Sequence, residues 1–174
     1  ASLDPPAPQC LGAKAPKHVQ HFLSLASEGT YDGTLFHRVI KWGIAQGGDP
    51  LSREPARKSV WGTGGMNKVP FESSDVKHVR GTLSSVLFPG KPDSGGNQFF
   101  VCVTPQPQLD GQFTAFGYVA EGIEVVDRIS EAPADQNGLP LHGLLLVMGN
   151  IIGLPQLIIT YAMANIFVHN VYQV

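Results

Sequence analysis

The chain has 174 residues, the size of a single domain, and its 43% hydrophobic content excludes intrinsic disorder as the main state. Its 20 Gly and 14 Pro residues are typical of a turn-rich globular fold with more strand than helix. The net charge of −2 gives no electrostatic reason to expect nucleic acid as a partner, so none is predicted.

A Pro-rich leader without an alternating apolar pattern occupies residues 1–14. From residue 15 onward apolar side chains recur at helical spacing, and Pro16 and Gly29 stand where helices commonly begin and end. This pattern predicts an amphipathic helix of roughly three turns, and a second, shorter helix is predicted over residues 122–129. Strands are predicted over residues 34–40, 44–50, 81–88, 97–104 and 114–119, with a loop at 62–65.

The C-terminal segment from residue 136 to residue 174 carries no formal charge. Residues 144–168 within it are long enough to cross a bilayer at about 1.5 Å per residue. Several polar residues and Pro155 interrupt this run, and no Lys or Arg flanks it, which favours a terminal strand at 144–149 and then an apolar tail. Membrane contact through 144–168 is the alternative. The chain starts with Ala and shows no signal segment, so either one was processed or none was present. The compartment is left open, with a cytoplasmic protein favoured over a membrane-tethered one.

Sequence signatures of nucleophilic, metal-dependent and nucleotide-dependent catalysis are absent: the chain has no GxSxG, HExxH, CxxC or GxxxxGK[ST]. His18 and His21 have a spacing compatible with two metal ligands, but no third ligand is identifiable nearby. We therefore expect solvent-exposed histidines, no metal and no cofactor. Asp110, in the turn sequence LDGQ, is expected to form a turn rather than act as a general base. Cys102, in the run FFVCV, is expected to be a small buried hydrophobe, whereas Cys10 lies in the Pro-rich leader.

One cation on a predicted strand stands among apolar and amide residues. Ile44 and Gln46 follow Arg38 by six and eight residues, and even separations place side chains on one face of an extended strand. The turn between them weakens this argument. Gln98 and Phe100 are again two residues apart. From periodicity alone, a lone Arg on a strand is more typical of a surface or salt-bridged residue than of an active one.

Six motifs stand in a recognisable order: FHRVI, QGGD, GTGG, NQFF, LDGQ with TAFG, and EGIEVVDRI. In order and approximate spacing, from residue 15 to residue 129, they resemble the cyclophilin-type peptidyl-prolyl cis-trans isomerases, most closely in style the compact single-domain bacterial members. The resemblance implies a mainly β fold, a closed antiparallel eight-stranded barrel plugged by two α-helices. The departures from the family pattern at both ends of the chain predict irregular first and last strands. The isomerase domain is then expected at residues 15–148, between the leader (1–14) and an uncharged apolar tail (149–174).

The resemblance also implies an activity and a site. Arg38 matches the catalytic arginine, Gln46 the amide that orients it, and Phe100 the floor of a proline pocket. The implied substrate-binding residues around them are Ile44, Gln98, Leu109, Phe113 and Val86. The implied function is cofactor-independent isomerisation of Xaa-Pro bonds in polypeptides, assisting protein folding. The alternative is a proline-peptide binding module with little or no turnover, and in either case a monomer is expected.

Several positions depart from the family pattern. Gly43 replaces a pocket phenylalanine, and Trp42, one residue away, is expected to face the other side unless the turn changes register. Gln108 stands where members that bind cyclosporin tightly carry Trp, so only weak binding of cyclosporin-type ligands is expected. Val86 and Leu87 replace a small-then-polar pair at the groove edge and are expected to narrow it.

Overall fold

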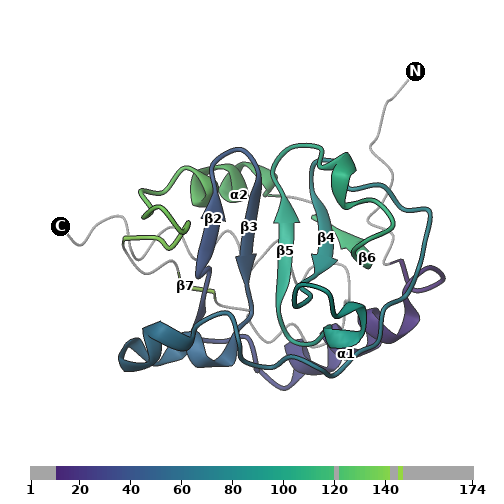
Figure 1. Cartoon of the computed structure of the whole chain (residues 1–174), viewed down its shortest axis with the longest axis horizontal. Helices are drawn as coiled ribbons and strands as arrows, with labels where there is room; N and C mark the ends of the chain where they lie inside the picture. Colours follow the sequence, from purple (N-terminus) through teal and green to yellow (C-terminus); the bar gives the residue numbers. More distant parts are fainter. Residues whose placement is uncertain (1–10, 120–121, 142–144, 147–174) are drawn as a thin grey trace.

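The computed structural model describes residues 11–119, 122–141 and 145–146. Five strands form one antiparallel sheet in the order β2-β3-β5-β4-β6, and β1 pairs with β7 in a separate two-stranded sheet (Figure 1). The elements are α1 (Pro16–Ser27), β1 (Thr34–Leu35), β2 (Arg38–Ile40), β3 (Ile44–Gly47), β4 (Thr82–Ser85), β5 (Phe99–Cys102), β6 (Ala115–Tyr118), α2 (Ile123–Ser130) and β7 (Leu145–Leu146). Short 3-10 helices, η1 (Pro50–Arg53), η2 (Pro55–Val60), η3 (Pro92–Ser94) and η4 (Pro107–Leu109), lie in the connections.

The mainly β fold with two α-helices is confirmed, whereas the described residues do not form one closed sheet of eight strands. The strand predicted over residues 34–40 is in fact two strands, because the backbone leaves the extended ladder at residues 36–37. Its first half belongs to the small sheet and its second half to the large one. β7 lies inside the strand predicted at 144–149. The other residues of the 144–168 segment lie outside the described residues. So do the tail from residue 149 onward and residues 1–10, which include Cys10. The structure has no helix, within the described ranges, that is long and apolar enough to cross a bilayer.

Both predicted helices form. Pro16 occupies the first turn of α1, and Gly29 follows its end with a φ of +68°, a left-handed conformation that glycine adopts readily. Ala15 has no side chain that could cap the helix, so Glu72 does so from a distant loop, accepting hydrogen bonds from the backbone N–H groups of Lys17 (3.0 Å) and His18 (2.9 Å).

His18 corrects one expectation, because its side chain is buried instead of exposed. It shares the core-facing stripe of α1 with Phe22 and Ala26, at intervals of four residues. Its Nδ1 lies 2.6 Å from a carboxylate oxygen of Glu72. Burial is the main cause that lowers the pKa of His18. Burial acts to raise the pKa of Glu72, but hydrogen bonds from the ring and from the start of α1 outweigh it and lower that pKa. The pair is therefore a neutral imidazole donating to a carboxylate.

Cross-strand register in the large sheet separates a core face from an outer face. On the core face Val39 pairs with Ala45, Ala45 with Val101, and Val101 with Leu83. All four side chains are buried, and residues of α1 and α2 pack against them in one hydrophobic core. Cys102 at the end of β5 is also fully buried, which confirms the small hydrophobe expected there, and burial raises the pKa of its thiol to about 12.

Candidate active site

Three of the predicted site residues are direct cross-strand neighbours in the large sheet. The Cα partner of Arg38 in β2 is Gln46 in β3, and the partner of Gln46 in β5 is Phe100. Because residues directly opposite each other in a ladder project to the same face, the three side chains form one row across the sheet. The row alternates with the buried core row, so it lies on the face that α1 and α2 leave uncovered (Figure 1).

A groove of about 600 Å³ runs over this row. Seven of the eight predicted site residues line it, and Gln98 does not. The groove also takes in residues that the sequence did not single out, from the segment after β3 and from the loop before β7. Its lining comprises His37, Arg38, Ile40, Gly43, Ile44, Gln46, Lys58, Trp61, Gly62, Val86, Leu87, Phe88, Pro89, Phe100, Gln106, Gln108, Leu109, Phe113, Asn137 and Leu139.

The Arg38 side chain is solvent-exposed, but its guanidinium is oriented by the sheet. Its Nη1 donates to Oε1 of Gln46 at 3.3 Å. No carboxylate among the described residues forms an ion pair with it. The remaining guanidinium donors are therefore available to a ligand in the groove, and since Arg stays protonated at all working pH values they need no titratable partner.

Gln46 and Gln98 form a buried chain of amides behind this guanidinium. Gln46 Nε2 donates to Gln98 Oε1 at 3.2 Å, and Gln98 Nε2 donates to the carbonyl oxygen of Gly64 at 2.8 Å. These bonds assign both amide orientations, so Oε1 of Gln46 points at Arg38. Gln98, only 1% exposed, thus lies beneath the groove and not in its wall.

The row of amide hydrogen bonds ends at Gly64, in the GTGG loop, where the surrounding atoms require a glycine. A Cβ at Gly64 would lie 2.1 Å from Oδ1 of Asp49, a fully buried carboxylate. Asp49 accepts backbone N–H donors from Gly62 and Gly64 and so binds the loop to the end of β3. The loop is a structural anchor for Gln98, which agrees with the prediction of a loop at 62–65.

Phe100 is held between two rings. His78 stacks against it with centroids 6.0 Å apart and planes 17° apart, and Phe113 meets it edge-on at 5.7 Å and 84°. The imidazole of His78 is buried between Asp110 Oδ1 (3.1 Å) and Ser84 Oγ (3.0 Å). Asp110 also accepts the backbone N–H of His78 at 2.8 Å, which is the main cause that lowers the pKa of this carboxyl. Asp110 is therefore a turn and anchoring residue, as predicted, and His78 is a supporting residue with no signal in the sequence pattern.

The departures at the β2–β3 turn have a steric explanation. A Cβ at Gly43 would lie 2.8 Å from Cγ2 of Ile40, so Ile40 occupies the space that a larger side chain would need. Trp42 adopts a φ of +57° in this turn, is 48% exposed and does not line the groove. It therefore does not replace the missing aromatic wall. Val86 and Leu87, the two residues expected to alter the groove edge, do line the groove, and so does Gln108.

His37 lies next to the row and is buried. Its Nε2 is 3.4 Å from Nε2 of Gln46. Burial is the main cause that lowers its pKa, and the positive charge of Arg38 acts in the same direction while Asp49 opposes it. The imidazole is consequently neutral at physiological pH, and the permanent charge of the row resides on Arg38.

This site and fold correspond to a known class. Residues 11–148 match the family model described as cyclophilin-type peptidyl-prolyl cis-trans isomerase/CLD, so the chain belongs to the cyclophilin-type peptidyl-prolyl cis-trans isomerase family. Among its relatives, peptidyl-prolyl cis-trans isomerase CYP18-2 of Arabidopsis thaliana is 34% identical over 138 residues, which cover 79% of this chain and 82% of that protein. Isomerase ppi1 of Schizosaccharomyces pombe is 36% identical over 133 residues, 76% of this chain and 83% of that protein.

Solved structures agree with the family assignment. A cyclophilin-type isomerase of Cryptosporidium parvum, crystallised in the presence of the dipeptide Ala-Pro, superposes with a TM-score of 0.69 at 31% identity. The alignment covers 78% of this chain and 85% of that one.

Proposed function

We propose that the groove isomerises Xaa-Pro bonds by seating the proline ring on Phe100 and stabilising the twisted imide with Arg38. As a member of its family the chain is a cofactor-independent peptidyl-prolyl cis-trans isomerase. The observation that carries the mechanism is the cross-strand row of Arg38, Gln46 and Phe100, which joins a fixed cation to an apolar ring on one face of the sheet. The Ala-Pro dipeptide present with the Cryptosporidium parvum relative supports a proline-containing peptide as the ligand class.

The chemistry needs neither a nucleophile nor a metal, because no bond is made or broken. Rotation about an Xaa-Pro bond crosses a barrier of about 18–20 kcal/mol, since it removes amide resonance. In the twisted state the proline nitrogen regains a lone pair and accepts hydrogen bonds. A guanidinium that donates to this nitrogen binds the twisted form better than either planar form, which is the requirement for catalysis.

The size of the required effect is compatible with the site. Lowering the barrier by ~6 kcal/mol shortens isomerisation from tens of seconds to milliseconds. Arg38 is open to water in the free groove, so a bound peptide must cover it before its hydrogen bond reaches full strength. Removal of water by the peptide therefore belongs to the catalytic effect.

The other predicted residues have distinct proposed roles. Gln46 holds the guanidinium in the row, and Gln98 holds Gln46, so Gln98 is a positioning residue rather than a contact of the peptide. The apolar walls that receive the proline ring are Ile44, Leu109, Phe113 and Val86.

We propose that the domain over residues 15–148 completes the eight-stranded barrel plugged by its two helices; the β1–β7 pairing, which joins residues 34–35 to residues 145–146, supports this. Gln108 in the groove lining supports only weak binding of cyclosporin-type ligands. We also expect a monomer.

A protease-coupled assay on a short Xaa-Pro peptide tests the mechanism. Arg38→Ala is expected to lower kcat/KM by at least tenfold, because one selective charge-assisted hydrogen bond contributes about 1.5–3 kcal/mol. Lys41→Ala, which removes one charge from the exposed turn of the same hairpin, is expected to leave the rate unchanged. Peptide binding with an isomerisation rate equal to the uncatalysed one would instead identify a binding module.

A further inference from the structure

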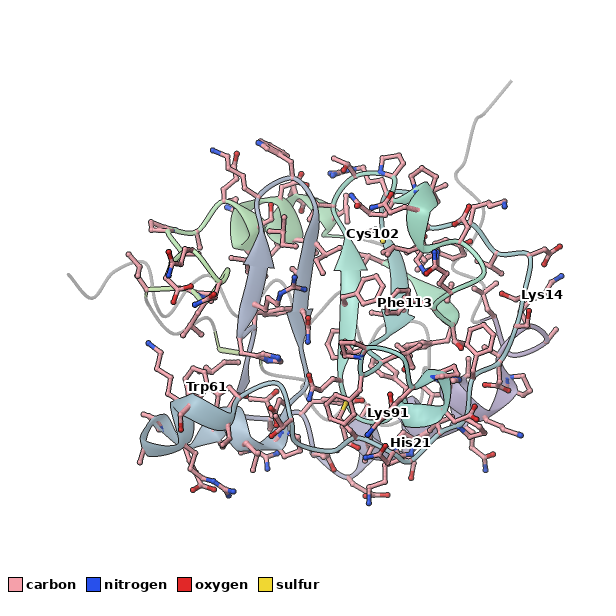
Figure 2. The ribbon with its side chains drawn as sticks, viewed as in Figure 1. Lys14, His21, Trp61, Lys91, Cys102 and Phe113 are labelled. Atoms are coloured by element: carbon pink, nitrogen blue, oxygen red, sulfur yellow. The ribbon has the colours of Figure 1, made fainter. Side chains whose placement is uncertain are left out.

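The groove extends past the row to a second end formed by the segment after β3. Lys58, in η2, and Trp61, which follows η2, line the same groove as Arg38 and Phe113. Figure 2 shows Trp61 beside this helical segment and Phe113 across the face of the sheet, so these two aromatic residues of the groove lining lie well apart. A peptide that lies along the groove from Phe113 across Arg38 would reach Lys58 and Trp61.

The groove carries positive charge with no acidic residue in its lining. Arg38 and Lys58 are the two basic residues, Lys or Arg, in its lining. Within the described ranges, no carboxylate forms an ion pair with either of them. Glu54, the acidic residue nearest to Lys58 in sequence, lies 3.6 Å from Arg57, and Asp110, which follows the groove residue Leu109, lies 3.3 Å from Lys77. Asp49, a buried carboxylate that accepts the backbone N–H of Gly62 behind the groove, offsets part of this charge. The charge carried by the groove lining itself is nevertheless that of Arg38 and Lys58, and it favours an anionic side chain.

Trp61 gives this end a defined shape. Its ring is partly buried, and Nε1 donates to the backbone carbonyl of Glu54 at 3.3 Å, which fixes the ring against η2. Lys58 precedes it by three residues on the same short helical segment, and the carbonyl of Lys58 accepts the backbone N–H of Trp61 at 3.3 Å. A fixed aromatic ring beside a free ammonium group can bind the methylenes and the charge of one acidic side chain together.

We infer that the isomerase prefers Xaa-Pro segments with an aspartate or glutamate on the side of the proline that lies toward Lys58 and Trp61. The inference rests on the proposed function, since it assumes that the proline occupies the Phe100 pocket. It names the substrate class of that site: acidic proline-containing segments of polypeptides.

The test measures kcat/KM for Ala-rich Xaa-Pro peptides in which one glutamate is moved through the positions before and after the proline. On one side of the proline, glutamate is expected to raise kcat/KM roughly two- to fivefold over glutamine, the size of an exposed charge pair. The gain is expected in KM rather than kcat, because the contact is made equally in the planar and twisted states. High salt is expected to remove it.

Variants locate the effect. Lys58→Ala is expected to reduce the glutamate-to-glutamine ratio to about one, and Lys58→Glu to reverse it in favour of a lysine peptide. Arg57→Ala is the matched control, because this substitution removes an equal charge from η2 at a residue that does not line the groove. Equal rates for all peptides, or equal loss of the preference in Arg57→Ala and Lys58→Ala, would overturn the inference.

The neutral peptide separates this inference from the proposed function. Turnover of the glutamine peptide without any preference for glutamate refutes the inference alone, whereas no turnover of either peptide refutes the proposed function. In the latter case binding still decides the inference. Trp42→Phe leaves Trp61 as the only tryptophan of the chain, and its fluorescence is expected to report tighter binding of the glutamate peptide. Equal affinity of both peptides in this variant would refute the preference.

Discussion

Gln98 offers the sharpest test of the amide chain behind Arg38, and Gln98→Glu changes it by one atom. In the native structure Nε2 of Gln98 donates to the carbonyl of Gly64 at 2.8 Å. An ionised glutamate cannot donate, so it would place a negative oxygen against that carbonyl in a site only 1% exposed. Its pKa is therefore expected to rise, because burial without a cation disfavours the charged form.

The magnitude follows from one buried hydrogen bond. Leaving a buried acceptor unsatisfied costs about 1–3 kcal/mol, and a buried charge adds to this, so Gln98→Glu is expected to destabilise the domain by at least that amount at pH 8. The substitution is also expected to slow catalysis, since a displaced side chain at position 98 no longer holds Gln46 against Arg38. We expect kcat to fall about five- to tenfold, corresponding to 1–1.4 kcal/mol.

Protonation supplies the decisive readout. A neutral carboxyl group has one donor and one acceptor, as the native amide does here, so lowering the pH toward 6 is expected to restore kcat in Gln98→Glu relative to the native protein. Gln98→Leu is the control, because no pH can restore its hydrogen bonds. An NMR exchange assay on an Xaa-Pro peptide measures kcat without a protease. A native-like kcat in Gln98→Leu, or a pH-independent defect in Gln98→Glu, would refute the positioning role.

Two further predictions concern stability and the groove wall. The pKa of His18 and that of His37 are lowered mainly by burial, so below about pH 6.5 the unfolded chain binds more protons than the folded one. The urea midpoint is therefore expected to decrease as the pH is lowered from 7.5 to 5.5, and to decrease less steeply in His18→Asn. A midpoint that stays constant over this range would contradict the prediction. Gly43→Ala places a Cβ 2.8 Å from Cγ2 of Ile40 and is expected to cost about 1–3 kcal/mol and to raise KM, whereas Gly12→Ala, with nothing within 4 Å, is expected to lower the urea midpoint far less.

Local pattern was sufficient for the elements that depend on neighbouring residues. Helical periodicity, Pro16 and Gly29 predicted α1 because a helix closes its hydrogen bonds within four residues. The even spacing of Arg38 and Gln46 predicted a shared face, and the hairpin register confirms it, because the side-chain period of a strand is two. The motif order was sufficient for the family.

Contacts between distant segments were decided only by the tertiary structure. His18 lies on the core-facing stripe of α1, but its burial needs a partner for its ring N–H, and this partner is Glu72, 54 residues away. Spacing along a helix carries no information on such a distant partner. Gln98 precedes Phe100 by two residues, which predicts the same face of the strand, yet its side chain lies beneath the groove, where it donates to the carbonyl of Gly64. His78 contacts Phe100 and Trp61 lines the groove, but both residues lie in segments between strands, where the sequence has no periodic pattern that predicts their position. A period states which side of an element a residue faces; packing of chain segments far apart in sequence decides what lies on that side.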